Sequence, residues 1–167
     1  YNKGNAVVCI MDNSTTAMTG HQPHAGTGID ILGEPTYKIN YPEVADALGI
    51  KRVYRTDAYN LEEIQDALEA ATDTDEAAVI INEGRCILLD WRELDIVPFQ
   101  VDQEKCTACG ICINVGCPAI SKDPETGKAT IDEMLCAGNH CTICQQVCPF
   151  DAINPVRPIV EQAGKNS

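Results

Sequence analysis

The chain has 167 residues, of which 44% are hydrophobic and 22% charged, so we expect a packed globular core rather than extensive disorder. Its formal net charge of −13 argues against nucleic acid and anionic membrane surfaces as partners, because both would repel it. The sequence shows no signal peptide and no apolar run near the ~18 residues of a membrane span, so we expect a soluble cytoplasmic protein. Because strand-like sequence begins almost at once after Tyr1, we expect the chain to be part of a longer polypeptide.

Strand and helix patterns alternate through the first hundred residues. Residues 6–12 form an apolar run of strand length, which we expect to be buried on both faces. Residues 13–28 are rich in Gly, Pro, Ser and Thr and predict a long loop. The other elements are expected at residues 42–48 (helix), 51–57 (strand), 61–71 (helix) and 77–82 (strand, running on through 84 to 89 as a hairpin or an extension). This alternation predicts a mainly parallel sheet with helices on its faces.

The helix over residues 61–71 has the clearest signals. Asn60 can cap its first turn, and Glu63 follows three residues later. The apolar face of this helix is expected to consist of Leu61, Ile64, Leu68 and Ala71. Cys9 and Cys86 lie in strand-like apolar sequence, where burial as small hydrophobic residues is the default, and we assign them no function.

A change of character at Pro98 predicts a second domain, which gives a division into residues 1–100 and 101–167. Residues 101–120 and 131–153 repeat one another, since each copy begins with an aliphatic residue and Asp and ends with Cys-Pro followed by Ala-Ile. Such a repeat predicts two copies of one supersecondary unit related by a pseudo-twofold axis. The polar sequence at 122–128, between the copies, predicts a hairpin turn.

Cysteine is dense in the second half, where eight of the ten cysteines lie between positions 106 and 148. They form two runs, Cys106-x2-Cys109-x2-Cys112-x4-Cys117-Pro and Cys136-x4-Cys141-x2-Cys144-x3-Cys148-Pro. Each resembles the bacterial ferredoxin pattern, in which three thiolates bind one 4Fe–4S cluster and the fourth cysteine reaches the other cluster. One cluster is therefore expected on Cys106, Cys109, Cys112 and Cys148. A second is expected on Cys136, Cys141, Cys144 and Cys117.

Disulfides and zinc are the alternative uses of these thiols. Disulfides require an oxidising compartment, which nothing in the sequence suggests. Structural zinc sites usually consist of separated C-x2-C pairs rather than interleaved triplets. The four-residue gap after Cys136 departs from the common ferredoxin spacing, and we expect a bulged loop around residues 137–140 to accommodate it.

The loop after the first strand is the second informative stretch, and it reads MDNSTTAMTGHQPHAGTG from Met11 to Gly28. In open α/β sheets, ligands bind beyond the carboxyl ends of the strands. Asn and Thr oxygens with backbone carbonyls suit Mg²⁺, and Gly-rich backbone suits a diphosphate. An ordinary solvent-exposed loop is the alternative that composition alone leaves open.

The D-N-x-x-T-A-M-T-G-H-Q-P-H string that starts at Asp12 resembles the thiamine-diphosphate loop of the 2-oxoacid:ferredoxin oxidoreductases. The resemblance is closest to the alpha subunits of indolepyruvate ferredoxin oxidoreductases, in which a two-cluster ferredoxin domain follows at the C-terminus. The resemblance covers essentially the whole chain. It implies that this chain is the C-terminal part of such a subunit. The implied fold is α/β, with the C-terminal half of a thiamine-diphosphate-binding parallel-sheet domain before a small α+β ferredoxin-like domain with two 4Fe–4S clusters.

The resemblance also implies roles for individual residues of the loop. The side-chain oxygen of Asn13 and the main-chain carbonyl of Thr15 would bind Mg²⁺. The residues expected beside the diphosphate and thiazolium are Thr16, Thr19, Gly20, His21 and Gln22. His21 and His24 could approach the substrate or be structural. The G-D-G-like motif that supplies the family's other Mg²⁺ ligand does not occur in this sequence, so a whole thiamine site would need further segments.

The activity implied by the resemblance is oxidative decarboxylation of an aryl 2-oxoacid to an acyl-CoA. Electrons would pass through the two clusters to ferredoxin, and the cluster potentials would be roughly −400 mV or below. The implied partners are the N-terminal part of the subunit, a smaller beta subunit, ferredoxin, CoA and the 2-oxoacid. Two alternatives remain open at this point: a ferredoxin-like electron-transfer subunit with a docking domain, and a binding module whose Asn13 loop serves another nucleotide or phosphate.

Overall fold

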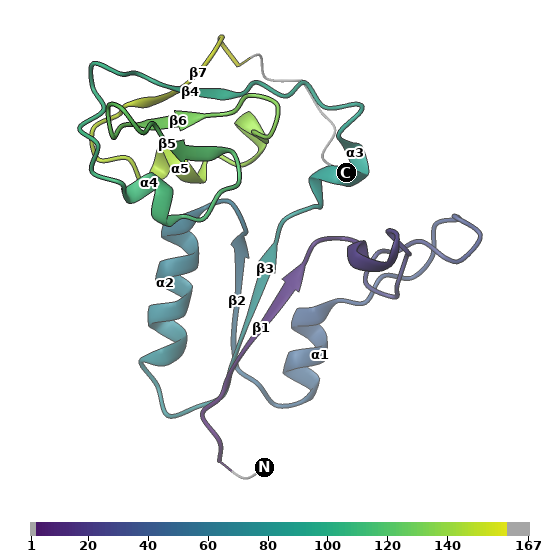
Figure 1. Ribbon diagram of the computed structural model, residues 1–167. Coiled ribbons are helices and arrows are strands. Elements are labelled where there is room, and N and C mark those ends of the chain that lie inside the picture. Colours follow the sequence, from purple (N-terminus) through teal and green to yellow (C-terminus); the bar gives the residue numbers. More distant parts are fainter. Residues whose placement is uncertain (1–2, 160–167) are drawn as a thin grey trace. The chain divides into compact units, whose positions relative to one another are not determined.

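The structure is a computed structural model that describes residues 3–159, and it forms two compact units that divide between Asp90 and Trp91 (Figure 1). The division lies ten residues before the boundary expected from Pro98. Residues 91–100 go with the second unit because Phe99 belongs to its buried core. In residues 3–159, no helix is both long enough and apolar enough to cross a lipid bilayer.

The first unit is a three-stranded parallel sheet with the strand order β1-β3-β2 (Figure 1). Its strands are β1 (Val7–Asp12), β2 (Arg52–Asp57) and β3 (Ala78–Glu83). The pairing is in register, so that Asp12, Asp57 and Glu83 lie side by side at the carboxyl ends. The connections carry the helices α1 (Tyr41–Ala47) and α2 (Leu61–Thr72). The parallel sheet expected from the alternating sequence is therefore confirmed.

Helices α1 and α2 pack against opposite faces of this sheet. Successive residues of β3 point to opposite faces. Ala78 and Ile80 pack with Ala67 and Ala71 of α2. On the other face, Val79 and Ile81 pack with Ala45 of α1. The alanines allow each helix to lie close to the central strand, whose four apolar residues from Ala78 to Ile81 are all buried.

The first turn of α2 has the cap that the sequence predicts. The Asn60 side chain accepts a hydrogen bond from Glu63 N at 3.2 Å, and it donates one to the Glu63 carboxylate at 2.8 Å. The buried face of α2 differs from the expected one, because Ala67 is buried while Leu68 is 41% exposed. The small alanine side chain fits against the sheet, whereas the larger Leu68 lies at its margin.

Two expectations for the first unit are wrong. β1 is an edge strand rather than a strand buried on both faces, with Val8 53% and Met11 69% exposed and Cys9 exposed as well. Only β3 is enclosed, because it alone has a strand on each side. Residues 84–89 do not continue β3. The chain instead turns past the end of β1 and forms the short helix α3 (Ile87–Asp90).

The second unit consists of two β-α-β copies that exchange strands. Its elements are β4 (Phe99–Val101), α4 (Ile111–Asn114), β5 (Ile120–Lys122), β6 (Ala129–Ile131), η2 (Gly138–His140), α5 (Ile143–Gln146) and β7 (Ile153–Pro155). β4 pairs antiparallel with β7, and β5 pairs antiparallel with β6. The first strand of each copy thus pairs with the last strand of the other, an arrangement that fits the two related copies expected from the internal repeat. The turn expected at 122–128 connects β5 and β6.

The core of the second unit is small and includes cysteines. Phe99, Ile120, Ala129 and Ile153 are buried with Cys112. Most of the other cysteines pack against this cluster, although they are only partly buried. The strands of each copy therefore position the cysteine-bearing loops around a small hydrophobic centre.

Candidate cluster and cofactor sites

The eight cysteines of the second unit gather in two quartets. The first quartet consists of Cys106, Cys109, Cys112 and Cys148. The second consists of Cys117, Cys136, Cys141 and Cys144. Each quartet combines three cysteines of one run with a cysteine of the other run. The structure thus brings together the same two sets of thiols that the spacing assigns to two clusters.

Burial and mutual repulsion both act on these thiols. Burial raises the pKa of Cys112 most, and the proximity of the other three thiols of its quartet raises it further. The same causes, in the same order, raise the pKa of Cys144 to about 11. Four such thiols cannot easily ionise together without a cation among them, because each thiolate opposes the next. A bound iron cluster would supply that positive charge, and the thiols would hold it as thiolates.

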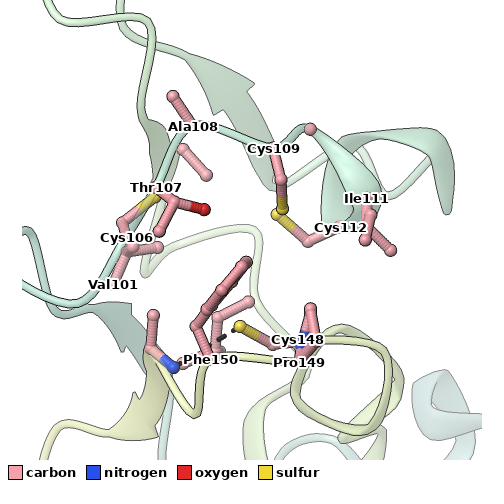
Figure 2. A pocket seen from close by; sticks show the side chains of 14 residues that line it. Val101, Cys106, Thr107, Ala108, Cys109, Ile111, Cys112, Cys148, Pro149 and Phe150 are labelled. Atoms are coloured by element: carbon pink, nitrogen blue, oxygen red, sulfur yellow. Dashed lines mark hydrogen bonds between the residues drawn. The ribbon is translucent and has the colours of Figure 1, made fainter.

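The first quartet lines an apolar pocket (Figure 2). Cys109 approaches it from the loop before α4 and Cys112 from α4 itself, and Cys148 approaches from the facing segment that also carries Pro149 and Phe150. The other lining residues include Val101, Ala129, Ala152 and Ile153. Convergent thiols with an apolar lining suit a 4Fe–4S cluster, whose ligands in proteins are four cysteine thiolates.

Left-handed backbone shapes both cysteine loops. Gly110, immediately before α4, has φ +78°, and Thr142, immediately before α5, has φ +58°. A residue in this conformation reverses the local curl of the chain, and glycine adopts it without strain.

Two backbone amides donate hydrogen bonds to cysteine sulfur. Gly138 N donates to Cys136 Sγ at 3.3 Å, and Ala152 N donates to Cys148 Sγ at 3.4 Å. Such bonds favour the thiolate and tune a bound cluster.

The gap between Cys136 and Cys141 contains a turn of 3-10 helix, η2. Residues 137–140 are therefore a compact turn rather than an irregular bulge.

All ten cysteines are free thiols in the structure, without disulfides. Within residues 3–159, no three His, Cys, Asp or Glu side chains converge closely enough to hold a single metal ion.

In the first unit, the loop after β1 closes on itself. Thr16 N donates to Gln22 O at 3.0 Å, and His21 N donates to Thr16 O at 3.1 Å. Between them lies a short 3-10 turn, η1 (Ala17–Thr19). Gly20 has φ +111°, so the closure requires a conformation that glycine adopts easily. The structure thus holds Thr16, Thr19, Gly20, His21 and Gln22 in one small ring.

The start of this loop is held by side chains of its own. The Asp12 carboxylate accepts a bond from Ser14 N at 2.9 Å, and Asn13 Oδ1 accepts one from Thr15 N at 3.2 Å. Asp12 and Thr15 are buried. The amide oxygen of Asn13 and the carbonyl of Thr15, the two expected Mg²⁺ ligands, therefore belong to one tight turn at the carboxyl end of β1.

Cys86 lies against this loop, although the sequence gave it no function. Its backbone N donates to Asn13 O at 3.0 Å, and its Sγ is 3.9 Å from His21 Nε2. It is half-buried in the turn before α3, not in a strand. The sequence held no signal for this contact, because only the strand order places β1 beside β3 and so brings the segment after β3 to the loop after β1.

Comparisons with known proteins agree with both units. Residues 1–82 match the family of thiamine pyrophosphate enzymes, C-terminal TPP binding domain, where TPP is thiamine diphosphate. The indolepyruvate oxidoreductase subunit IorA of Pyrococcus abyssi is 40% identical over 163 residues, which are 94% of this chain and 25% of that protein. The IorA subunit of Archaeoglobus fulgidus is 39% identical over the same length. The chain thus spans about a quarter of the length of these relatives.

Two further matches cover smaller shares of this chain. The pyruvate synthase subunit PorD of Methanocaldococcus jannaschii is 38% identical over 86 residues, which are 48% of this chain and 92% of that protein. Ferredoxin I of Desulfovibrio africanus, a solved structure, is 28% identical. That match covers 37% of this chain and 98% of the ferredoxin with a TM-score of 0.33, too low to establish a shared fold by itself.

Sequence, fold and matches together define a class of redox protein in which part of a thiamine-diphosphate-type domain precedes a ferredoxin-like domain in one chain. The chain belongs to the 2-oxoacid:ferredoxin oxidoreductase family, and 94% of its length is similar to a quarter of the IorA subunits.

Proposed function

We propose that this chain is the C-terminal part of a cytoplasmic 2-oxoacid:ferredoxin oxidoreductase that converts an aryl 2-oxoacid, such as indolepyruvate, and CoA to an acyl-CoA. The observation that carries the proposal is the presence in one chain of a closed Asp12–Gln22 loop at the carboxyl end of a parallel sheet and two quartets of thiols. Aryl substrates are favoured because relatives at 35–40% identity over 93–94% of this chain bear the name indolepyruvate oxidoreductase.

In this proposal each quartet holds one 4Fe–4S cluster, and each cluster would carry one electron at a time when bound. The cysteines act as thiolate ligands. The apolar lining around the first quartet limits access of water to the metal and so affects its potential. The amides of Gly138 and Ala152, bonded to Cys136 and Cys148, stabilise negative charge on these sulfurs and hold their side chains in place.

The loop after β1 would bind the diphosphate of thiamine diphosphate through Mg²⁺. Thiamine diphosphate supplies the carbanion chemistry of decarboxylation when it is bound. Asn13 and Thr15 offer two hard oxygen ligands of the kind that Mg²⁺ prefers. The ring from Thr16 to Gln22 presents hydroxyl and backbone groups beside them. The remaining parts of this site would come from an N-terminal part of the subunit and a smaller beta subunit.

A second function is an electron-transfer subunit that binds clusters but no thiamine diphosphate. It is favoured by the match to PorD. This match covers 92% of PorD, and PorD is a subunit of a larger enzyme, pyruvate synthase. In that case the first unit would only dock a partner. The two functions differ in one property, the affinity of the intact protein for thiamine diphosphate.

The test is to purify the intact protein without oxygen and to measure iron, acid-labile sulfide and thiamine diphosphate binding. We expect about eight iron and eight sulfide per chain, and an EPR spectrum of two interacting clusters after reduction. Asn13→Ala should weaken Mg²⁺-dependent cofactor binding at least about tenfold, the effect of losing one charge-assisted ligand. Asn5→Ala, at an exposed position, is the matched control.

The outcomes separate the proposals. Acyl-CoA formation with ferredoxin reduction, lowered by Asn13→Ala but not by Asn5→Ala at a limiting thiamine diphosphate concentration, would support the oxidoreductase. Full iron content without thiamine diphosphate binding would favour the electron-transfer subunit. Zinc in place of iron would overturn both.

A further inference from the structure

The segment that enters the second unit, residues 95–98, is attached to the cysteine loop of the second quartet. Asn139 lies in η2, between Cys136 and Cys141. Its side-chain oxygen accepts a hydrogen bond from Val97 N at 2.8 Å, and its backbone N donates one to Val97 O at 3.1 Å. One residue of the gap therefore satisfies both backbone groups of Val97.

The neighbouring glycine shows how close this approach is. Gly138 has φ +59°, and a Cβ atom at this position would lie 2.2 Å from Val97 O. No ordinary side chain fits at that distance, so the backbone of η2 runs directly against the backbone of the entering segment. Two of the four residues between Cys136 and Cys141, Gly138 and Asn139, thus make this contact.

The entering segment has few alternatives for these bonds. Val97 is 1% exposed, so its N–H cannot turn to water if the Asn139 oxygen is removed. The segment is held on its other side as well, because Val156 N donates to Pro98 O at 2.9 Å and the Arg157 guanidinium pairs with the Asp95 carboxylate. Loss of one buried partner would leave a costly unsatisfied donor inside a fixed frame.

The other four-residue gap, between Cys112 and Cys117, is built differently. Asn114 in that gap is exposed, and a Cβ on Gly116 would meet no atom within 4 Å. A gap of this length therefore does not by itself require packing against another segment. The contact with Val97 is a property of the gap between Cys136 and Cys141.

We propose that Asn139 is a positioning residue for the second cluster, which fixes the loop that carries Cys136 and Cys141 by bonding to Val97. The inference rests on the proposed function, since it presupposes a cluster on the second quartet. It adds that the entering segment and this cluster stabilise one another, whereas the first cluster does not depend on the segment.

The test compares three variants of the intact, iron-loaded protein. Asn139→Ala removes the bond to Val97 N. Asn139→Asp keeps an oxygen acceptor at the same position, and Asn114→Ala removes an exposed asparagine from the other gap. The first readout is hydrogen exchange of the Val97 amide, and the second is the rate of iron release to a chelator, followed by iron content and EPR.

For Asn139→Ala we expect exchange at Val97 about tenfold faster, which corresponds to one lost hydrogen bond. We expect iron to be lost in two phases, with about four iron atoms released severalfold faster than in the wild type. EPR of the remaining species should show a single, uncoupled cluster. Asn114→Ala should match the wild type, and Asn139→Asp should restore protection of Val97.

Asn139→Ala protein that retains both clusters as firmly as Asn114→Ala would overturn the inference while leaving the proposed function intact. Unchanged exchange at Val97 would also overturn it. Wild-type protein purified without iron would overturn the proposed function first, and this inference with it.

Discussion

Gly116 and Gly138 allow the cost of a close backbone approach to be measured at single residues. Both have left-handed backbone, with φ +76° and φ +59°. Alanine at either position should lose roughly 1–2 kcal/mol of stability from backbone strain. Gly138→Ala should lose at least a further ~1–3 kcal/mol, because its Cβ overlaps Val97 O while that of Gly116 meets open space. Thermal unfolding of the iron-loaded protein at one scan rate checks this, and equal shifts for the two variants would contradict it.

At the same scale, the candidate site residues could be found from the sequence to different degrees. The cysteine quartets follow from spacing, because a covalent chain with two residues between thiols can reach only nearby corners of one cluster. The residues from Asn13 to Gln22 were found through a contiguous motif. Cys86 was missed because its neighbour, His21, is distant in sequence, and local hydrophobicity cannot report such a contact.

At the scale of elements, the cap of α2 offers a test of the first unit. Asn60→Ala removes the acceptor for Glu63 N and should destabilise this unit by about 1 kcal/mol. Asn60→Asp keeps the acceptor and places a negative charge at the helix N-terminus, where it is favourable, so it should cost less. Urea unfolding of both variants followed by circular dichroism measures the difference. A loss for Asn60→Asp as large as that for Asn60→Ala would show that the cap does not act through its oxygen.

Elements were predicted well where the signal is local, and poorly where burial depends on neighbours. Caps and periodicity located α1, α2 and β2 to within a residue or two of their observed bounds. The exposure of β1 could not be predicted from its apolar sequence, because only the strand order shows that β3 is the central strand. Residues 87–89 were expected to continue the strand or a hairpin for a similar reason. Their apolar sequence fits a short helix equally well once the chain has left the sheet.

At the scale of the whole molecule, the two units should respond differently to loss of iron. The first unit has aliphatic packing on both faces of its sheet, whereas the core of the second unit is a few residues surrounded by cysteines. A domain of fewer than about 80 residues with so small a core usually needs a disulfide or metal to remain folded. We therefore expect iron to be the main source of stability for the second unit.

Removal of iron by a chelator under anaerobic, oxidising conditions should consequently unfold the second unit and leave the first folded. Amide protons of the β4–β7 and β5–β6 pairs should then exchange freely, because each pair spans only three residues per strand. Amide protons of β3, which is paired on both sides, should stay protected. Reconstitution with iron and sulfide should restore protection in both pairs. Persistent protection of β5 and β6 without iron would contradict this expectation. It would show that the small hydrophobic core keeps the second unit folded by itself, and that the clusters bind to a domain that is already folded.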